Sequence, residues 1–460
     1  MASSFVCFDT DIIPFPLCQQ RRSAARQHRV DRAGVLGHPC ENPERSASSV
    51  ADRPKDVDLD DTSPEDTGAV GVAFQHTSKK GPEFRTWFRG EHTNFNPKLQ
   101  QLMELDGPEK WVLHGWLPDA PLIDKGTQIT AFGSCFAANI SNWLSERNFR
   151  VLNRAGDAAR AYVVTMGEGM VNSFVIRQQF EWAWENRVFG QALWHGYKTE
   201  EYGYDEDVRL ETKRIFDETE VFILTFGLSE VWYDEKTGNV FWRTIPKDAY
   251  DPERHKFRLS TVEENRDNIR AIYDLIRKYR PDAKVIVTLS PVPLVATFRD
   301  VSCITANSVS KATLRVAIDE VCREVRDEGR LFYWPSYELV TDVFRSPYKA
   351  DRRHVRPVVL SYIMHLFESA WCKDSGVTGT ELLEAWVRAH VASGTLPGEL
   401  QPILAKRKPY RLRKFLSGVR LHEDDRTDAA MRGLLETLLD AWRAERAEAE
   451  AQDEPADADA

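Results

Sequence analysis

Residues 127–144 read TQITAFGSCFAANISNWL and place a short strand, a glycine and a helix in direct succession. Residues 127–132 are rich in β-branched and apolar side chains, which favours a strand. Apolar residues then recur at helical spacing over about 137–147, which predicts a helix. Gly133 allows a sharp turn between the two and leaves two potential nucleophiles, Ser134 and Cys135, beside the start of the helix.

The same alternation continues through the middle of the chain. Short, nearly continuous apolar runs predict buried strands at 127–132, 149–152, 221–226, 284–289 and 331–334. Helical patterns lie between them, at about 137–147, 172–185, 261–280 and 306–328. This alternation predicts βαβ units and an α/β fold, in which a parallel sheet lies between two layers of helices. We expect 127–132, 221–226 and 284–289 to be adjacent and parallel, with 127–132 central.

The two ends of the chain have a different composition. Residues 1–75 contain a basic and then an acidic stretch with few aromatic side chains, which predicts a disordered N-terminal segment. We expect the folded domain over 85–375. Only helical patterns follow it, which predicts a helical extension over 376–448. Residues 449–460 are acidic and of low complexity, and are predicted to be a disordered tail.

Composition narrows the class of protein. The 460 residues carry a formal net charge of −10, and no basic stripe interleaves with aromatic residues, so we expect no nucleic-acid partner. No apolar run has the length of a membrane span and no secretory signal pattern is present, so the expected location is the cytoplasm. The seven cysteines are widely spaced without a C-x-x-C pair, which argues against a disulfide framework or a metal site. Reduced thiols are expected.

Functional groups in open parallel sheets gather beyond the C-terminal ends of the strands. Cys135 follows the first predicted strand, Gly227 and Ser229 follow the strand at 221–226, and Asp351 and His354 come late in the chain. A helix start lowers the pKa of a thiol and stabilises negative charge. His354 could act as a general base, and Asp351, three residues earlier, could orient its ring. Together they form the pattern of a nucleophile, a base and an orienting group.

Structural explanations compete with these roles. A single thiol such as that of Cys135 is more often a small buried hydrophobic group than a nucleophile. The Asp351–His354 spacing is common on surfaces, and the neighbouring arginines fit either a solvated basic loop or attraction of an anionic substrate. Other conspicuous residues are assigned to structure: Lys311 to a helix face, the Trp-rich stretch 180–194 to the core or a pocket wall, and His195, His255 and His365 to packing.

The sequence FGSCFA at 132–137 resembles the signature of the GSCFA domain family. The similarity covers roughly 85–375 and extends through further blocks in order, namely GEGMVNSFVIRQQFEWAW (167–184), LTFGLSEVWYD (224–234), TLSPVPL (288–294), SKATLRVA (310–317), YWPSYELV (333–340) and DRRHVRP (351–357). That family is grouped with the SGNH (GDSL-like) hydrolases. The resemblance implies a flavodoxin-like three-layer α/β/α sandwich with a parallel sheet, to which the helical pattern after residue 375 adds a C-terminal helical appendage.

The resemblance also implies roles for single residues. The superfamily's Gly-Asp-Ser block falls on Gly133-Ser134-Cys135, which makes Cys135 the nucleophile and Ser134 the alternative. Its Asp-x-x-His block falls on Asp351 and His354. An oxyanion-binding glycine falls loosely on Gly167 or Gly169. The Gly-x-Asn-Asp block becomes Gly227-Leu228-Ser229-Glu230, so that the usual Asn is absent and the Ser229 hydroxyl is the substitute donor.

A cysteine nucleophile favours particular chemistry. Its acyl-enzyme is a thioester, and exchange with a thioester donor is nearly balanced in energy. We therefore expect hydrolysis or transfer of an acyl group from an ester or thioester, with no required cofactor. Acyl-coenzyme A is a candidate donor and a saccharide hydroxyl a candidate acceptor. The alternative is a catalytically inactive sandwich that binds a carbohydrate or a protein, with Cys135 packed in its core.

Overall fold

The computed structural model describes residues 71–78, 81–88, 94–102, 106–154, 160–166, 169–196 and 198–393. A hairpin of β1 (Gly71–Ser78) and β2 (Gly81–Phe88) belongs to a separate unit that ends at Asn94. Residues 71–75, which the sequence assigned to a disordered segment, form the start of β1. The rest of that segment, the tail predicted over 449–460 and the extension beyond residue 393 lie outside the described residues.

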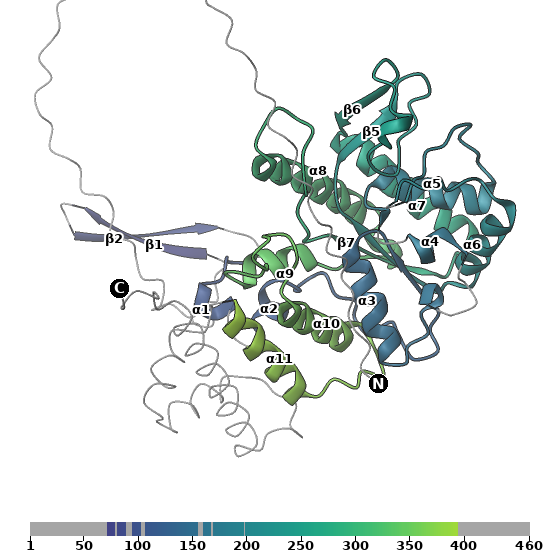
Figure 1. The fold of residues 1–460 in the computed structure, drawn as a ribbon. Helices are drawn as coiled ribbons and strands as arrows, with labels where there is room; N and C mark the ends of the chain where they lie inside the picture. The colour runs from purple at the N-terminus through teal and green to yellow at the C-terminus, as the bar shows by residue number, and fades with distance from the viewer. Residues whose placement is uncertain are drawn as a thin grey trace, which may run out of the picture. The chain divides into compact units, whose positions relative to one another are not determined.

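The second unit contains a parallel sheet in the order β3-β4-β7-β8. Figure 1 shows one of these strands, β7, among the surrounding helices. Its strands are β3 (Ile129–Phe132), β4 (Val221–Phe226), β7 (Lys284–Leu289) and β8 (Leu331–Tyr333). The three strands expected to be adjacent and parallel are so, but the expectation that 127–132 is central is wrong, because β4 lies between β3 and β7. The predicted strand at 149–152 is reduced to a single parallel bridge between Val151 and Ile129.

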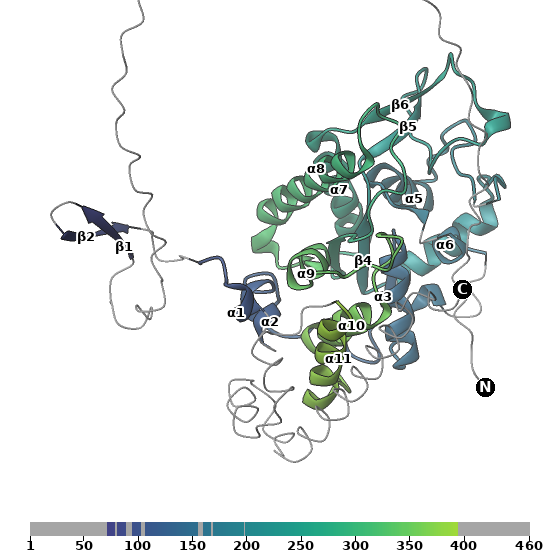
Figure 2. The ribbon, with the colours of Figure 1, turned by 60° about the vertical axis from the view of Figure 1, so that its left-hand side comes forward.

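Two apolar cores cover opposite faces of this sheet. Alternate residues of β4 separate into them: Val221 and Ile223 belong to one core, and Phe222 and Leu224 to the other. The first core is closed by α3 (Cys135–Glu146), α9 (Ser336–Val343), α10 (Pro357–Trp371) and α11 (Gly379–Ala392). The second is closed by α5 (Ser173–Glu185), α6 (Glu206–Glu218), α7 (Val262–Tyr279) and α8 (Cys303–Glu324). The predicted three-layer sandwich is therefore confirmed (Figure 2).

Helix boundaries follow ordinary capping chemistry. Asn172 and Asp205 accept backbone N–H groups at the starts of α5 and α6. Thr261 and Glu264 form a reciprocal capping box at the start of α7. The Trp-rich stretch lies partly in α5, and its Trp182 and Trp194 are buried in the second core, as expected.

Smaller elements connect the layers. An antiparallel hairpin, which the sequence did not predict, is inserted between β4 and α7 and consists of β5 (Glu230–Asp234) and β6 (His255–Leu259). The short helices are α1 (Leu99–Leu102), α2 (Gly107–Trp111), α4 (Tyr162–Thr165) and the 3₁₀ turns Leu152–Arg154, Lys247–Ala249 and Arg326–Glu328. α11 packs on α10, and its Trp386 is buried in the first core.

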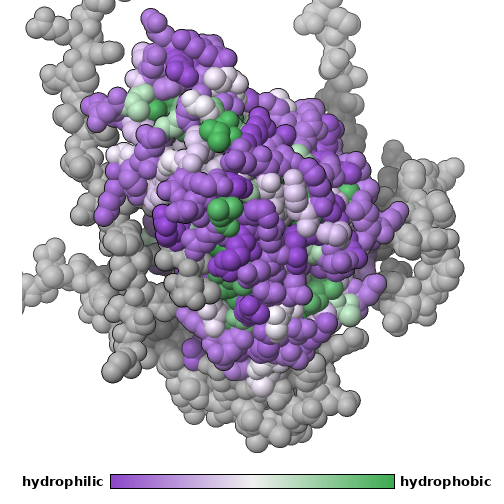
Figure 3. Space-filling view, turned by 90° about the vertical axis from the view of Figure 1, so that its right-hand side faces the viewer, coloured by the Kyte–Doolittle hydropathy of each residue, from purple (hydrophilic) through white to green (hydrophobic). Residues whose placement is uncertain are grey.

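The molecular face in Figure 3 is mainly hydrophilic, with apolar residues in small separated groups. On this face the exposed apolar side chains of the described residues form no continuous patch. In the described part of the chain, no helix combines the length and the apolar character that crossing a bilayer requires.

Candidate active site

The turn after β3 depends on a glycine. Gly133 has φ +132°, a region that side chains rarely adopt. A Cβ atom at this position would lie 2.2 Å from the carbonyl oxygen of Thr225 on β4. Gly133 therefore allows the backbone to leave β3 while it stays in close contact with the neighbouring strand, and it delivers Ser134 and Cys135 to the C-terminal edge of the sheet.

Ser134 and Cys135 have different places at the start of α3. Ser134 is the N-cap: it is buried, and its Oγ accepts the N–H of Phe136 at 3.2 Å. Cys135 is the first residue of the helix and is half-buried. The Ser134 hydroxyl thus satisfies the helix start, and the Cys135 thiol lies beside backbone N–H groups and the positive end of the helix dipole.

Asp351 and His354 form a pair within one loop. Oδ2 of Asp351 lies 2.5 Å from Nδ1 of His354, and Oδ1 accepts the N–H groups of Arg353 and His354, both at 3.0 Å. A proton on Nδ1 leaves Nε2 as the basic nitrogen of the ring. The backbone donors, that of Arg353 first, and the imidazole lower the pKa of Asp351 to about 2, so its carboxylate is ionised at neutral pH.

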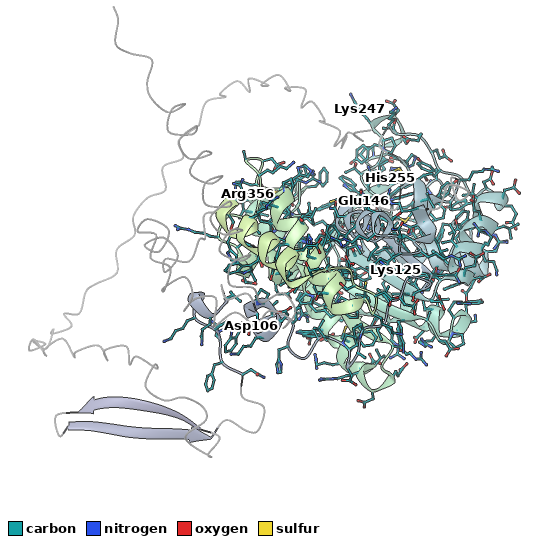
Figure 4. The ribbon with its side chains drawn as sticks, turned by 90° about the horizontal axis from the view of Figure 1, so that it is seen from below. Asp106, Lys125, Glu146, Lys247, His255 and Arg356 are labelled. Carbon is teal, nitrogen blue, oxygen red and sulfur yellow. The ribbon has the colours of Figure 1, made fainter. Side chains whose placement is uncertain are left out.

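The loop that carries His354 is fastened to the same edge of the sheet. The half-buried Tyr348 donates its hydroxyl hydrogen bond to the carbonyl of Pro291 at 2.8 Å, two residues beyond the end of β7. Two backbone bonds close the loop, from Lys349 to His354 and from Arg356 to Pro347, each 2.8 Å long. α10 begins directly after Arg356, which is labelled in Figure 4. Cys135 and His354 are therefore both on segments at the C-terminal edge.

A buried lysine, Lys311, also lies at this edge. It is on α8, as the sequence indicated, but it is almost fully buried, at 2% exposure. Its Nζ donates to the carbonyls of Gly227 at 2.7 Å and of Ser290 and Val292 at 2.8 Å. Burial lowers the pKa of Lys311 to about 7, and the charge of Cys135 acts in the opposite direction. The sequence pattern placed Lys311 on a helix face but did not predict its burial or its bonds to these carbonyls.

A signal for Lys311 was present in the helical pattern. Leu314, Ile318 and Cys322, which lie three, seven and eleven residues later, are all buried in α8. A lysine on the apolar stripe of a helix is a buried charge, and such a charge requires partners.

Comparison with known protein families gives a match over the sheet-forming region. The GSCFA family matches residues 128–367, just over half of the chain, from β3 into α10. The chain belongs to the GSCFA family. No curated protein matches it.

The five letters that name the GSCFA family have separate physical functions in this chain. Gly133 makes the turn, Ser134 caps α3, and Cys135 supplies the thiol. Phe136 and Ala137 are almost completely buried against the sheet. Packing and capping thus account for four of the five residues, and the half-buried Cys135 is the one that fold stability explains least.

The expected oxyanion donors of this GSCFA protein are already engaged. The N–H of Gly169 donates to Met166 at 2.8 Å, and that of Gly227 donates to Val171 at 2.7 Å. Ser229 is completely buried, and both its N–H and its hydroxyl bond to Oγ of Ser310, at 2.8 and 3.2 Å. This geometry does not favour Gly169, Gly227 or Ser229 as donors to a reacting oxygen. Gly167 lies outside the described residues.

The three histidines that the sequence analysis assigned to packing have local partners or are buried. His365 donates from Nδ1 to the carbonyl of Ser361 at 2.7 Å, Nδ1 of His255 accepts the N–H of Asp251 at 3.0 Å, and His195 is buried. Across the described ranges, no group of three or more His, Cys, Asp or Glu residues has an arrangement suited to a metal ion.

Proposed function

We propose that this GSCFA protein hydrolyses or transfers an acyl group carried on an ester or thioester, with Cys135 as nucleophile, His354 as general base and Asp351 as the residue that orients it. The observation that carries the proposal is the Asp351–His354 pair, at 2.5 Å, in a loop bonded to the end of β7. Cys135 begins α3 at the same edge of the sheet. Resemblance to the SGNH hydrolases supports the same three roles.

The first half of the reaction forms a thioester on the protein. The Cys135 thiolate, whose proton has passed to Nε2 of His354, attacks the acyl carbon, and the carbonyl oxygen takes up negative charge. As the tetrahedral intermediate collapses, the bond to the donor oxygen or sulfur breaks, and that atom leaves as an alcohol or thiol with a proton from Nε2 of His354. Asp351 stabilises the protonated imidazole through Nδ1.

The second half of the reaction regenerates the Cys135 thiolate. Nε2 of His354 removes the proton from water or an acceptor hydroxyl as its oxygen attacks the thioester carbon. The C–S bond then breaks, and Cys135 leaves as a thiolate. Because thioester exchange is nearly balanced, acyl-coenzyme A is the donor we propose to test first, with a saccharide hydroxyl as acceptor. A reducing, cytoplasmic setting would keep the thiol available.

Turnover by single variants tests this function. Purified protein is assayed with acyl-coenzyme A and with an aryl ester, in water and with added monosaccharides. C135A should abolish turnover, C135S should lower it strongly because a hydroxyl is a weaker nucleophile, and S134A should keep a measurable fraction. An inactive S134A beside an active C135A would assign the reaction to Ser134. Turnover of all three equal to wild type would exclude the proposed chemistry and favour a binding protein.

A further inference from the structure

Lys311 is a buried cation whose charge is not balanced by a carboxylate. Among the described residues its Nζ contacts three backbone carbonyls and forms no ion pair with Asp or Glu. Carbonyls satisfy hydrogen bonds but carry no net charge. Burying an isolated charge is costly, so a buried lysine normally has a counter-charge or becomes neutral.

The three carbonyls identify the protonated form. A neutral amine has two N–H donors, whereas an ammonium group has three. Gly227, Ser290 and Val292 each accept a hydrogen bond of 2.7–2.8 Å from the same nitrogen. Only the ammonium form can donate to all three at once, so these bonds favour a positive charge beside the ends of β4 and β7 and oppose the loss of the proton that burial favours.

Cys135 lies close to this charge. Gly133 packs so closely on β4 that a Cβ atom there would meet the Thr225 carbonyl, and Lys311 bonds to Gly227, two residues beyond Thr225. Cys135 is two residues beyond Gly133. Other titratable groups on the segments at this edge include His354, Asp351 and Tyr348, in the loop before α10, and Glu230, which follows Ser229. The Asp351 charge is already paired with His354, and the Glu230 carboxylate accepts a hydrogen bond from Thr297.

We propose that the Lys311 ammonium is the counter-charge of the Cys135 thiolate, and that it is a positioning residue that keeps this thiol ionised near neutral pH. This proposal rests on the nucleophilic role proposed for Cys135. Lys311 also joins the segment that follows β4 to the segment that follows β7, because it bonds to carbonyls of both. One side chain thus couples the geometry of two strand ends to the reactivity of the thiol.

The test measures ionisation of the thiol without any acyl substrate. The rate of iodoacetamide alkylation of the Cys135 peptide is followed by mass spectrometry as a function of pH, which resolves it from the other cysteines. In K311M the midpoint should rise by about 1 to 3 pH units, because an opposite charge nearby favours the thiolate by that amount. K311Q, which is neutral but retains amide donors, provides a second variant if K311M does not fold. K311R, which keeps the charge, should shift the midpoint less.

Two control variants separate charge from structure. S310A removes the buried hydroxyl next to Lys311 that binds Ser229, so it should lower the melting temperature and leave the alkylation midpoint unchanged. H354A removes the base proposed to accept the proton of the thiol. A midpoint that moves in H354A but stays at the wild-type value in folded K311M or K311Q would overturn the proposal. Because no acyl donor is used, this outcome is distinct from a failure of acyl transfer.

Discussion

Oδ2 of Asp351 lies 2.5 Å from Nδ1 of His354, and the other carboxylate oxygen of Asp351 accepts two backbone hydrogen bonds from the same loop. One carboxylate oxygen thus fixes Asp351 to the loop, and the other holds the imidazole of His354. Any role of His354 as a base depends on this pair, because the pair determines which ring nitrogen is basic.

Removal of the base should cost more than removal of the residue that orients it. H354A should lower acyl-transfer turnover by roughly 10²- to 10⁴-fold, the usual contribution of a general base. D351A should cost less, since the ring is still present in a fraction of the correct tautomer and orientation. Steady-state rates of both variants with the same donor check this order, and a larger loss in D351A than in H354A would contradict it.

The lowered pKa of Asp351 has a consequence for stability. A carboxylate whose pKa falls from 3.8 unfolded to about 2 folded stabilises the fold above pH 3.8, and this contribution is lost as the pH falls toward 2. The difference in free energy of unfolding between wild type and D351N should therefore shrink across that window. Urea unfolding at a series of pH values measures it. The difference should be small, since both side chains are about half exposed, and a difference that grows on acidification would be evidence against the pair.

Gly133 should tolerate no side chain. G133A combines an unfavourable backbone conformation with a Cβ atom 2.2 Å from the Thr225 carbonyl, so it should destabilise the fold by roughly 2 kcal/mol or more. G115A is a matched control: Gly115 has φ +79°, but nothing lies within 4 Å of an added Cβ atom. Thermal unfolding of the two variants should separate them, and equal losses would show that contact with β4 is unimportant.

Ser134 should matter mainly as a helix cap. S134A should lower the free energy of unfolding by about 0.5–2 kcal/mol while thiol alkylation persists. T261A removes a comparable cap from α7 and serves as the control. We expect similar losses of stability in the two variants, measured by denaturant unfolding. Complete loss of acyl transfer in a folded S134A protein would instead assign chemistry to its hydroxyl.

The bond from Tyr348 to Pro291 should position His354. Y348F removes this hydrogen bond, with an expected stability loss of about 0.5–1.5 kcal/mol. Y204F deletes a bond of the same length, from Tyr204 to the carbonyl of Gln191. Both variants should lose similar stability, but only Y348F should lower acyl transfer clearly, because only this bond holds the loop of His354. Equal activities would mean that the loop is positioned by other contacts.

The local features of the fold were predictable from the sequence. Runs 221–226 and 284–289 are strands over those same residues, because strands covered on both faces are apolar without interruption. The turn at Gly133 and the Asp351–His354 spacing were equally visible, since each lies within a few residues of chain.

Non-local features could not be read in the same way. The position of β4 between β3 and β7 depends on which strands pair, and no single strand carries that information. The engaged N–H group of Gly227 depends on a contact with Val171, on a distant segment, that the sequence does not specify. The hydrogen-bond partners of Lys311 could not be predicted, because they depend on which carbonyls face α8.

The most direct test of the central claim is to locate the acyl group on the protein. Wild type, H354A, C135A and S134A are incubated briefly with an acyl thioester, quenched in acid, digested and analysed by tandem mass spectrometry. We predict a thioester-linked acyl group on Cys135, absent in C135A and retained in S134A. An acyl group on Ser134, or rapid turnover of the donor by the C135A variant, would contradict the account.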